Sequence, residues 1–425
     1  MQNDFDIAVI GAGAAGMMAA AEAARRGRSV CVLEKANKAG VKILMSGGTR
    51  CNVTHDCDAA GIMEAFGKNG RFLRQALAEL SPTDVVQMFR DLGVPTKVEP
   101  GGKIFPESDR ALDVCQALQR RMTESGATLR LGSAVQNLSR TETGFQIDLD
   151  GQSLHCRSVI VTVGGMSYPG CGTVGDGYNW LQQLGHTILT PRPSLVPIVG
   201  GSAWTWELQG LTLLEAQVTV GKPGVAKKKG KLAQRTGGLL FTHFGFSGPT
   251  AMDVSRAITA VEDLSTIELR INALPGWNDD RLNSWFDAKR ASEPSRQLDK
   301  ALCEILPRRL ASALIEQAQI AGEKPLAELS GANRRLLVEG MLRNRMPIQG
   351  TRGFKKAEVT AGGVSLKEVD PRTMHSRTVD GLYIAGEILD LDGWIGGYNF
   401  QSAFSTGTVA GRSAAESLHD ADAGG

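Results

Sequence analysis

Residues 5–16 have the sequence FDIAVIGAGAAG, an apolar run that leads into three glycines spaced as G-x-G-x-x-G. A helical stretch follows, then a second apolar run from Ser29 to Leu33 and the acidic residue Glu34. This order of strand, glycine turn, helix, strand and acid is typical of a βαβ unit that binds a dinucleotide. We therefore predict a Rossmann-type fold at the N-terminus.

Each glycine of the turn has its own mechanical role. Gly11 permits the tight turn, Gly13 lets the backbone approach a pyrophosphate, and Gly16 lets the helix pack closely on the strand. The phosphates then lie at a helix N-terminus, where unpaired N–H groups and the helix dipole favour anions. Glu34 is expected to accept hydrogen bonds from the adenosine ribose.

Composition limits the class of protein. The chain has 425 residues, of which 42% are hydrophobic, so we expect two or three domains. A net charge of +2 gives no general attraction to nucleic acids or membranes, and we expect neither as a partner. Seven scattered cysteines without a C-x-x-C pair, and no apolar run of membrane-spanning length, predict a cytoplasmic protein. The sequence does not indicate an oligomeric state.

Changes in residue pattern along the chain predict four segments. Residues 1–190 form the first part of the dinucleotide-binding domain, and residues 191–275 form a β-rich insertion that begins with three prolines. Leucine and alanine at helical spacing predict a helical subdomain at residues 276–345. Residues 346–425 then complete the dinucleotide-binding domain.

A second glycine-rich region identifies the dinucleotide. Residues 381–387, GLYIAGE, predict a buried strand that ends in Gly386 and Glu387, and residues 396–399, GGYN, open a helix expected to reach about Leu418. An NAD enzyme needs only the first βαβ unit, whereas the longer FAD molecule must be held by a second segment. We expect Glu387 to accept hydrogen bonds from the ribityl chain. The helix N-terminus would stabilise negative charge on the pyrimidine side of the flavin.

Longer motifs resemble one family, the BaiN/RdsA-type NAD(P)/FAD-dependent oxidoreductases, also called the aminoacetone oxidase family. They are SGGTRCN (46–52), GDGY (175–178), FTHFG (241–245), TAGGV (360–364) and GWIGGYNFQ (393–401). The resemblance covers nearly the whole chain. It implies an α/β fold: a glutathione-reductase-like FAD-binding Rossmann domain with an inserted β-barrel-like domain and a small helical subdomain. The chain departs from the family at Thr49, where a third glycine is usual, and at Val163, where threonine is usual. We expect both changes to alter what lies over the flavin.

The resemblance also implies an activity. Members are associated with the reduction of unsaturated steroid-like substrates or the oxidation of small amines. We predict an FAD-dependent oxidoreductase that moves a hydride through flavin N5 between a nicotinamide or amine-like donor and a small organic substrate or oxygen, with NAD(P)H bound only transiently. The alternatives are a flavin-dependent nucleic-acid-modifying or RNA-binding protein and a flavin-binding protein without turnover. No residue identifies itself as catalytic.

The residues that we predict to contact the cofactor are Gly11, Gly13, Ala14, Ala15, Gly16, Glu34, Lys35, Lys42, Ser46, Gly47, Arg50, Cys51, Asn52, Val135, Gly164, Gly386, Glu387, Gly397, Tyr398 and Asn399. Lys42 and Arg50 add positive charge that suits a substrate carboxylate, the flavin or a phosphate. No cluster of histidine, cysteine and acidic residues has metal-ligand spacing, so no metal is expected.

Other features have less specific interpretations. Residues 170–175, GCGTVG, also match G-x-G-x-x-G, but six residues separate them from the preceding strand and no ribose-binding acid follows, so we expect no separate nicotinamide domain. The C-x5-C spacing of Cys51 and Cys57 is too wide for the helical redox pair of disulfide reductases. His243 is expected to be a core or domain-interface histidine. The lysine run at residues 227–231 lacks interleaved aromatics and predicts a solvated hairpin tip. Trp394 either walls the flavin ring or packs its own loop.

Overall fold

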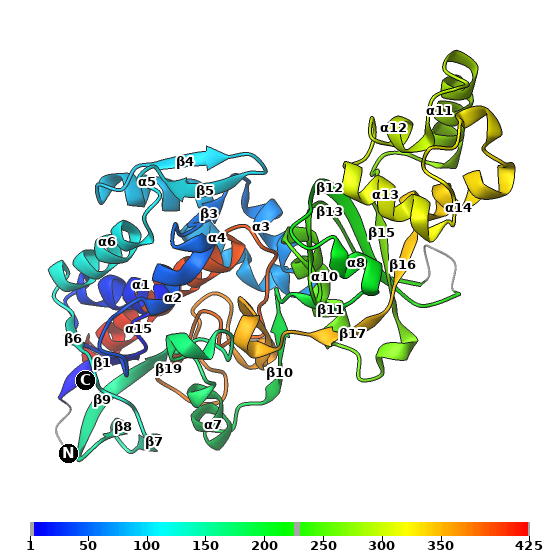
Figure 1. Ribbon diagram of the computed structural model, residues 1–425. Coiled ribbons are helices and arrows are strands. Elements are labelled where there is room, and N and C mark those ends of the chain that lie inside the picture. The colour runs from blue at the N-terminus through cyan, green and yellow to red at the C-terminus, as the bar shows by residue number, and fades with distance from the viewer. Residues whose placement is uncertain (1–3, 225–229, 424–425) are drawn as a thin grey trace. The chain divides into compact units, whose positions relative to one another are not determined.

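The computed structural model describes residues 4–224 and 230–423, with side chains as far as Leu418. The chain forms two compact units, one made of Met1–Pro193 with Glu358–Gly425 and the other of Ser194–Ala357 (Figure 1). The first unit therefore contains both ends of the chain. We predicted boundaries at residues 190/191 and 345/346 for the same division.

A parallel sheet forms the centre of the first unit. Its strands, in spatial order, are β6 (Thr128–Arg130), β2 (Val30–Leu33), β1 (Phe5–Ile10), β9 (Gln152–Val161) and β19 (Leu382–Ile384). In register, Val9 lies beside Val32 on one side and Ile160 on the other, and Ile160 also pairs with Tyr383. These apolar runs are buried because helices and loops cover both faces of a parallel sheet. The predicted N-terminal and C-terminal strands thus belong to one sheet.

Smaller elements surround this sheet. The hairpin β7 (Asn137–Thr141) and β8 (Gly144–Leu149) pairs with the first half of β9. A second small sheet is formed by β3 (Thr54–His55), β5 (Lys103–Pro106) and β4 (Thr96–Glu99), and β10 (Ile188–Ser194) pairs with β18 (Val359–Val364). The remaining helices of at least five residues are α2 (Val41–Met45), α3 (Ala59–Ala65), α4 (Arg74–Glu79), α5 (Pro82–Asp91), α6 (Ala111–Glu124) and α7 (Asp176–Gln183).

Two helices from opposite ends of the chain, α1 (Ala14–Ala24) and α15 (Tyr398–Ala423), lie side by side (Figure 1). Glycines on α15 make this contact unusually close. A Cβ atom added to Gly407 would lie 2.3 Å from the carbonyl oxygen of Ala15, and one added to Gly411 would lie 2.1 Å from that of Ala19. Only glycine fits at either position, so the backbones of the two helices touch.

The second unit is built on an antiparallel sheet of the order β16-β15-β12-β13-β14-β11-β17. The strands are β11 (Ile198–Gly200), β12 (Thr212–Gly221), β13 (Lys231–Thr242), β14 (Gly245–Ser247), β15 (Glu268–Asn272), β16 (Asn344–Met346) and β17 (Ile348–Thr351). β16 and β17 stand at the two ends of this order, and only Pro347 separates them along the chain. The sheet therefore curves round until its two ends meet in one segment of chain, in agreement with the barrel-like insertion predicted from the sequence. The lysines at positions 227–229, predicted to form a hairpin tip, lie outside the described residues.

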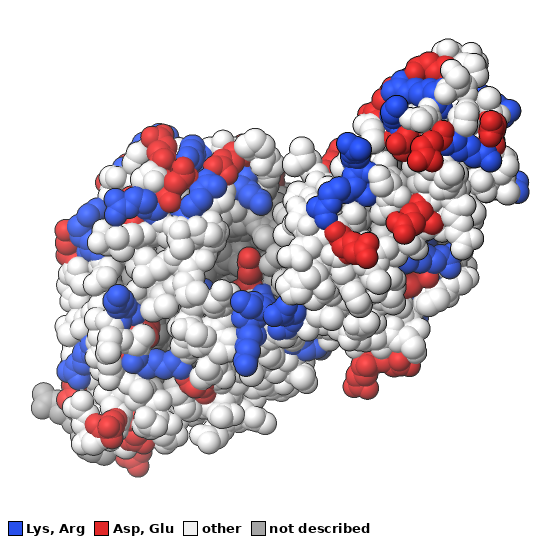
Figure 2. Space-filling model, viewed as in Figure 1, with Lys and Arg blue, Asp and Glu red and all other residues white. Residues whose placement is uncertain are grey.

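Helices complete the second unit. They are α8 (Ala203–Glu207), α10 (Pro249–Thr259), α11 (Asp279–Ser292), α12 (Leu298–Leu302), α13 (Arg308–Gln317) and α14 (Gly331–Leu342). The predicted helical subdomain corresponds to α11–α14, and its apolar residues join the core of the sheet, as Leu282 and Leu269 illustrate. On the face shown in Figure 2, its charges of opposite sign lie close together, in agreement with ion pairs such as Arg334–Asp287 and Arg343–Asp279.

None of the helices in the described residues is long and apolar enough to cross a membrane.

The contact between α1 and α15 predicts that Gly411→Ala destabilises the protein. Alanine normally favours a helix interior, but its Cβ would overlap the Ala19 carbonyl, and overpacking of this kind costs about 1–3 kcal/mol. Urea unfolding would measure the loss. Gly331→Ala is the matched control, because nothing lies within 4 Å of the added Cβ at that helical position. Equal stability of the two variants would contradict the contact.

Candidate functional site

The N-terminal glycine turn has the steric requirements that the sequence predicts. Gly11 has φ +100°, and a Cβ there would lie 2.9 Å from the Thr162 carbonyl oxygen. A Cβ on Gly16 would lie 1.9 Å from the Gly11 carbonyl oxygen. Gly13 differs from these two glycines, because nothing lies within 4 Å of a Cβ added there. The backbone at Gly13 therefore borders open space, as a site for close approach of a pyrophosphate requires.

The helix that starts after this turn presents free N–H groups. Gly13 is the N-cap of α1 and has no side-chain cap, and the first turn of α1 has no acidic residue. The first N–H groups of a helix have no partner within the helix, and they attract anions together with the helix dipole. The N-terminus of α1 is therefore suited to bind a phosphate group.

Glu34 closes one side of the turn. Its Oε2 accepts a hydrogen bond from Ala12 N and its Oε1 accepts one from Ala36 N, both at 2.9 Å. Each carboxylate oxygen offers two lone pairs, so both retain a position for another donor. Glu34 therefore fixes the glycine turn and is still able to accept hydrogen bonds from a ribose.

The C-terminal glycine-carboxylate motif lies against the same helix. Gly386 has φ +81°, and a Cβ there would lie 2.9 Å from the Ala15 Cβ. Its N–H donates to Thr406 Oγ1 of α15 at 3.1 Å. The structure thus brings Gly386 and Glu387 to the N-terminus of α1, although more than 360 residues separate them along the chain.

Glu387 is the centre of a hydrogen-bond network. Its Oε2 accepts from Lys42 Nζ at 2.8 Å, and its Oε1 accepts from Ser167 Oγ at 2.6 Å and from Thr360 N at 2.9 Å. Lys42 also donates to Ser167 Oγ at 2.7 Å. Three donors occupy most of the accepting capacity of the carboxylate, which leaves one lone pair of Oε2 for a hydroxyl group.

The sequence interpretation did not include Ser167 and Thr360. Thr360 Oγ1 accepts from the backbone N–H groups of Met166 and Ser167, at 2.8 and 3.0 Å. Two sequence features could have identified them as site residues. Thr360 starts the TAGGV motif, and Ser167 closely follows Gly164 and Gly165. A Cβ on Gly165 would lie 2.4 Å from Thr360 Oγ1, so this glycine is required for the network.

Lys35 pairs with Asp176, the first residue of α7. The G-x-G-x-x-G of residues 170–175 precedes this helix, so the Asp176 carboxylate stands in the first turn, where a nucleotide phosphate would bind. A negative charge at that place opposes anion binding. The geometry therefore argues against a separate nicotinamide site at residues 170–175.

One buried hydroxyl group near this helix has no partner. Tyr178 is 6% exposed, and no described atom bonds its hydroxyl oxygen. Burial raises the pKa of Tyr178, and the nearby carboxylates of Glu387 and Asp390 raise it further. An unpaired buried hydroxyl is costly, so it is a candidate contact for a polar group of a bound ligand.

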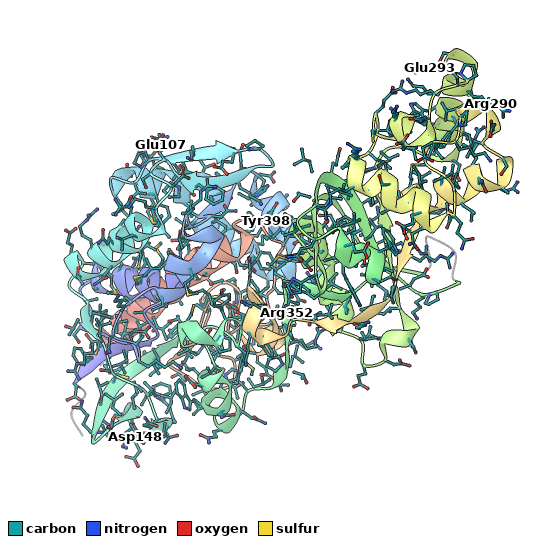
Figure 3. The ribbon with its side chains drawn as sticks, in the orientation of Figure 1. Glu107, Asp148, Arg290, Glu293, Arg352 and Tyr398 are labelled. Carbon is teal, nitrogen blue, oxygen red and sulfur yellow. The ribbon has the colours of Figure 1, made fainter. Side chains whose placement is uncertain are left out.

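A second group of predicted residues gathers at the start of α15. A Cβ on Gly397 would lie 2.4 Å from the Thr54 carbonyl oxygen and 2.8 Å from Asn52 Oδ1. Tyr398, labelled in Figure 3, stacks on His55 with ring centroids 4.5 Å apart. His55 Nδ1 lies 2.9 Å from the Gly396 carbonyl oxygen and must donate to it. His55 was not predicted as a site residue.

Asn399 and Trp394 stabilise the loop before α15. Asn399 Oδ1 accepts from Gly393 N at 2.8 Å, and Asn399 Nδ2 donates to the carbonyl oxygens of Gly393 and Trp394. The ring of Trp394 packs edge-on against Tyr398 at 6.0 Å. The packing role considered for Trp394 is thus present in the structure, and the backbone N–H groups at the N-terminus of α15 are what this loop offers to a ligand.

The loop of residues 46–52 has several left-handed backbone positions, and two of them, Thr49 and Cys51, are not glycine. Gly47 has φ +55°, Thr49 has φ +70° and Cys51 has φ +61°, in the left-handed region that favours glycine. Thr49 therefore holds the backbone of the glycine that is usual in the resembling family, at a conformational cost. Ser46 Oγ donates to the Ile43 carbonyl oxygen at 2.8 Å.

Arg50 is directed to a group of charged residues on β4 and in the turn after β5. It pairs with Glu99 and with Asp109, and its guanidinium lies 4.1 Å above the ring of Phe105. Lys97 and Arg50 lower the pKa of Asp109. The positive charge expected of Arg50 is therefore already balanced.

The other predicted positions lie at the edges of these groups. Ala14 is the first residue of α1. Gly164 has φ +76°. Val135 is half-buried close to Ser133, whose N–H donates to the Glu34 carbonyl oxygen at 2.9 Å.

The sequence also singled out His243, Cys51 and Cys57. His243 is exposed and packs edge-on against Phe244 at 5.0 Å. Of the two roles expected for it, core or domain interface, the core role is therefore wrong. Cys51 and Cys57 are both free thiols, and burial raises their pKa to about 12 and about 11. In the described part of the chain, no group of three or more His, Cys, Asp or Glu side chains is placed to hold a metal ion.

Comparisons with known proteins agree with this geometry. The sequence profile of the HI0933-like protein Rossmann domain matches residues 5–413. The chain is 36% identical over 402 residues to a ribosomal RNA dihydrouridine synthase of Escherichia coli K12, with 95% of this chain and 96% of that protein covered. It is 33% identical over 420 residues to a 3-dehydro-bile acid delta(4,6)-reductase of Clostridium scindens, with 96% and 99% covered.

Among solved structures, the fold is similar to that of a 3-ketosteroid-Δ4-(5α)-dehydrogenase from Rhodococcus jostii RHA1. The TM-score is 0.53 at 16% identity, with 98% of each chain covered. At this identity the likeness concerns the fold.

Burial predicts that Cys51 is inert in the native protein. The thiolate is the reactive form, and a pKa of about 12 keeps it scarce until the pH approaches that value. We expect iodoacetamide at about pH 8 to alkylate the exposed Cys303 and to leave Cys51 unmodified, as peptide mass spectrometry would show. Rapid alkylation of Cys51 in the folded protein would contradict this assignment.

The open space beside Gly13 predicts that Gly13→Leu blocks a dinucleotide without unfolding the protein. The leucine side chain would occupy the place expected for the pyrophosphate, and FAD affinity should fall by about 100-fold, or about 2.7 kcal/mol. Calorimetric titration with FAD would measure the change. Gly331→Leu is the control, because an added Cβ there also meets nothing within 4 Å, far along the chain from the turn. Unchanged FAD affinity in Gly13→Leu would show that FAD does not bind at the N-terminus of α1.

Proposed function

The chain belongs to the HI0933-like Rossmann family of flavoprotein oxidoreductases, and from that premise we propose that it binds FAD and reduces a carbon–carbon double bond conjugated to a carbonyl group. The observation that carries the proposal is the meeting of Gly386–Glu387 with the N-terminus of α1. A mononucleotide needs one anion site, whereas FAD needs a phosphate site and a second segment for its ribityl chain and ring. The first unit has both.

The residues present fit FAD. The N-terminal N–H groups of α1 would hold the pyrophosphate, Glu34 the adenosine ribose, and Glu387 a ribityl hydroxyl through the free lone pair of Oε2. The N-terminus of α15 would stabilise negative charge at the ring. When bound, FAD supplies a centre that accepts a hydride from one molecule and gives it to another. The chain supplies orientation and electrostatics.

The reaction class is supported by what the named relatives have in common. A dihydrouridine synthase and a delta(4,6)-reductase, as their names state, both reduce a carbon–carbon double bond. In a uridine and in a 3-oxo steroid alike, that double bond is conjugated to a carbonyl group. One hydride and one proton add across the double bond, and NAD(P)H, as the proposed donor, is oxidised to NAD(P)+. We propose that the nicotinamide visits the site transiently, since the Asp176 carboxylate after residues 170–175 disfavours a second dinucleotide site there.

For the substrate we propose a uridine in RNA. The net charge of +2 conceals an asymmetry, because residues 194–357 contain 23 lysines and arginines against 16 aspartates and glutamates. The second unit thus carries +7 and the remainder −5. A positively charged unit attracts a polyanion even when the whole chain is nearly neutral.

One surface pair of the second unit suits a nucleobase. Arg352, labelled in Figure 3, is exposed and stacks over the Phe244 ring at 4.5 Å. Among the described residues no carboxylate pairs with Arg352, in contrast to Arg334 and Arg343 on α14 and at its end. Aromatic rings and guanidinium groups stack on unpaired bases. Two further exposed cations, Lys355 and Lys356, follow Arg352 after Gly353 and Phe354.

A small conjugated enone is the second candidate substrate, favoured by the similarity to the delta(4,6)-reductase along 99% of that protein. The earlier expectation of a small organic substrate without a nucleic acid partner corresponds to this candidate. A cytoplasmic location suits both, because all seven cysteines are free thiols.

The proposal predicts that the reduced holoprotein gives its electrons to a conjugated double bond. Under anaerobic conditions, NADH or NADPH should bleach the flavin, and ribosomal RNA without dihydrouridine should restore its colour. Mass spectrometry of the RNA would then show a uridine with two added hydrogens. Recovery of the flavin colour with a 3-oxo-4-ene steroid but not with RNA would identify an enone as the substrate. Recovery with neither, but only with oxygen, would contradict a double-bond reductase.

As part of the same experiment, Arg352→Met should weaken binding of ribosomal RNA by about tenfold and reduce its salt dependence. Arg345→Met is the control, because Arg345 is 64% exposed but lies 3.7 Å from the Glu268 carboxylate. Both variants should keep the same flavin bleaching by NAD(P)H. Equal losses of RNA binding would mean that only the total charge matters.

A further inference from the structure

The glycine-rich segment Ser167–Asp176, which the proposed function leaves without a role, connects the two ends of the FAD site. We propose that this segment, here called the strap, closes over the pyrophosphate of bound FAD and that the ion pair Lys35–Asp176 holds it closed. The inference rests on the proposed binding of FAD. It adds the strap as a further FAD-binding element, and breaking the Lys35–Asp176 ion pair is the step that lets FAD leave.

The first end of the strap is fixed at the ribityl side. Ser167 is fully buried, its Oγ donates to Glu387 Oε1 at 2.6 Å, and its N–H donates to Thr360 Oγ1 at 3.0 Å. Lys42 Nζ donates to the same hydroxyl oxygen at 2.7 Å. This end is held by three hydrogen bonds, to Glu387, Thr360 and Lys42, and is not expected to open.

The second end is fixed at the adenosine side by fewer contacts. Asp176 pairs with Lys35, the residue after the ribose-binding Glu34. A Cβ on Gly172 would lie 3.3 Å from Lys35 Cε, so the lysine stem runs beneath the strap. The side chains of the pair are 34% and 36% exposed. An ion pair that exposed is weak and screened by salt, which makes this end the releasable one.

The middle of the strap spans the distance between these ends. The Cys171 Sγ lies 3.1 Å from the Met45 Sδ of α2, and Thr173 Oγ1 donates back to the Ser167 carbonyl oxygen at 2.5 Å. Tyr168, Gly172 and Gly175 have φ of +56°, +89° and +86°. Repeated left-handed positions give the backbone sharp turns and allow it to lie close to a ligand.

These contacts determine where the strap lies relative to bound FAD. Lys35 is next to the residue expected at the adenosine ribose, and Glu387 is the residue expected at the ribityl chain. The pyrophosphate joins these two parts of FAD, so a segment anchored at both must pass it. The glycines of GCGTVG then serve a close approach to FAD and not a separate nicotinamide site.

The test is the rate at which FAD leaves the holoprotein, followed by flavin fluorescence after dilution. Lys35→Met and Asp176→Asn should each release FAD about three- to fivefold faster than the wild type at low salt. Added salt should speed release from the wild type and leave both variants unchanged. The charge-reversed double variant Lys35→Asp with Asp176→Lys should restore slow release. Lys38→Met is the control, because Lys38 is an exposed cation three residues after Lys35 and has no ion pair among the described residues.

Each other outcome decides against the strap. Unchanged release in both single variants would show that the ion pair does not hold FAD. Faster release that the reversed pair does not restore would assign the effect to the separate residues, for example to the first turn of α7. A wild-type protein that takes up no FAD at all would overturn the proposed function first, and that result differs from normal uptake with unaltered release.

Discussion

The first unit depends on one steric constraint, the direct contact between the backbones of α1 and α15. Gly407 and Gly411 have no side chains, and this lets α15 touch the carbonyl oxygens of Ala15 and Ala19. Ala15 also meets Gly386 through its Cβ. Ala15, near the start of α1, is therefore in contact both with Gly386 and with α15. Side chains at these glycines would separate the helices and move Glu387 away from the anion site.

Electrostatic pairing is the second property of the site. Lys35, Lys42 and Arg50 were all predicted to contact the cofactor, and the structure gives each of them a carboxylate partner. Isolated charges in a partly buried site are costly, and pairing removes that cost. The backbone N–H groups at the N-termini of α1 and α15 then remain as the main attraction for negative charge. Recognition of a dinucleotide by backbone dipoles tolerates many side chains, which agrees with the 33–36% identity to the named relatives.

Much of the fold follows from local patterns. The run of residues 5–16 predicts its strand, turn and helix because each step uses a neighbouring residue, and the glycines at 11, 13 and 16 occupy the environments expected of them. The partners of Glu387 do not follow in this way. Lys42 and Ser167 lie 345 and 220 residues away along the chain, and no spacing rule relates them. The charge of the second unit is also concealed in the sum for the whole chain, because it depends on where the domains divide.

The sequence by itself determined that both ends of the chain carry dinucleotide-binding elements, because strands, helix starts and glycine turns are set by short-range sterics. Only the tertiary structure decided how the charged side chains are used: Lys35 with Asp176, Lys42 with Glu387, and Arg50 with Glu99. An ion pair or hydrogen bond acts over a few ångströms in space and is independent of separation along the chain. Such pairs are therefore fixed by folding and cannot be derived from the order of residues.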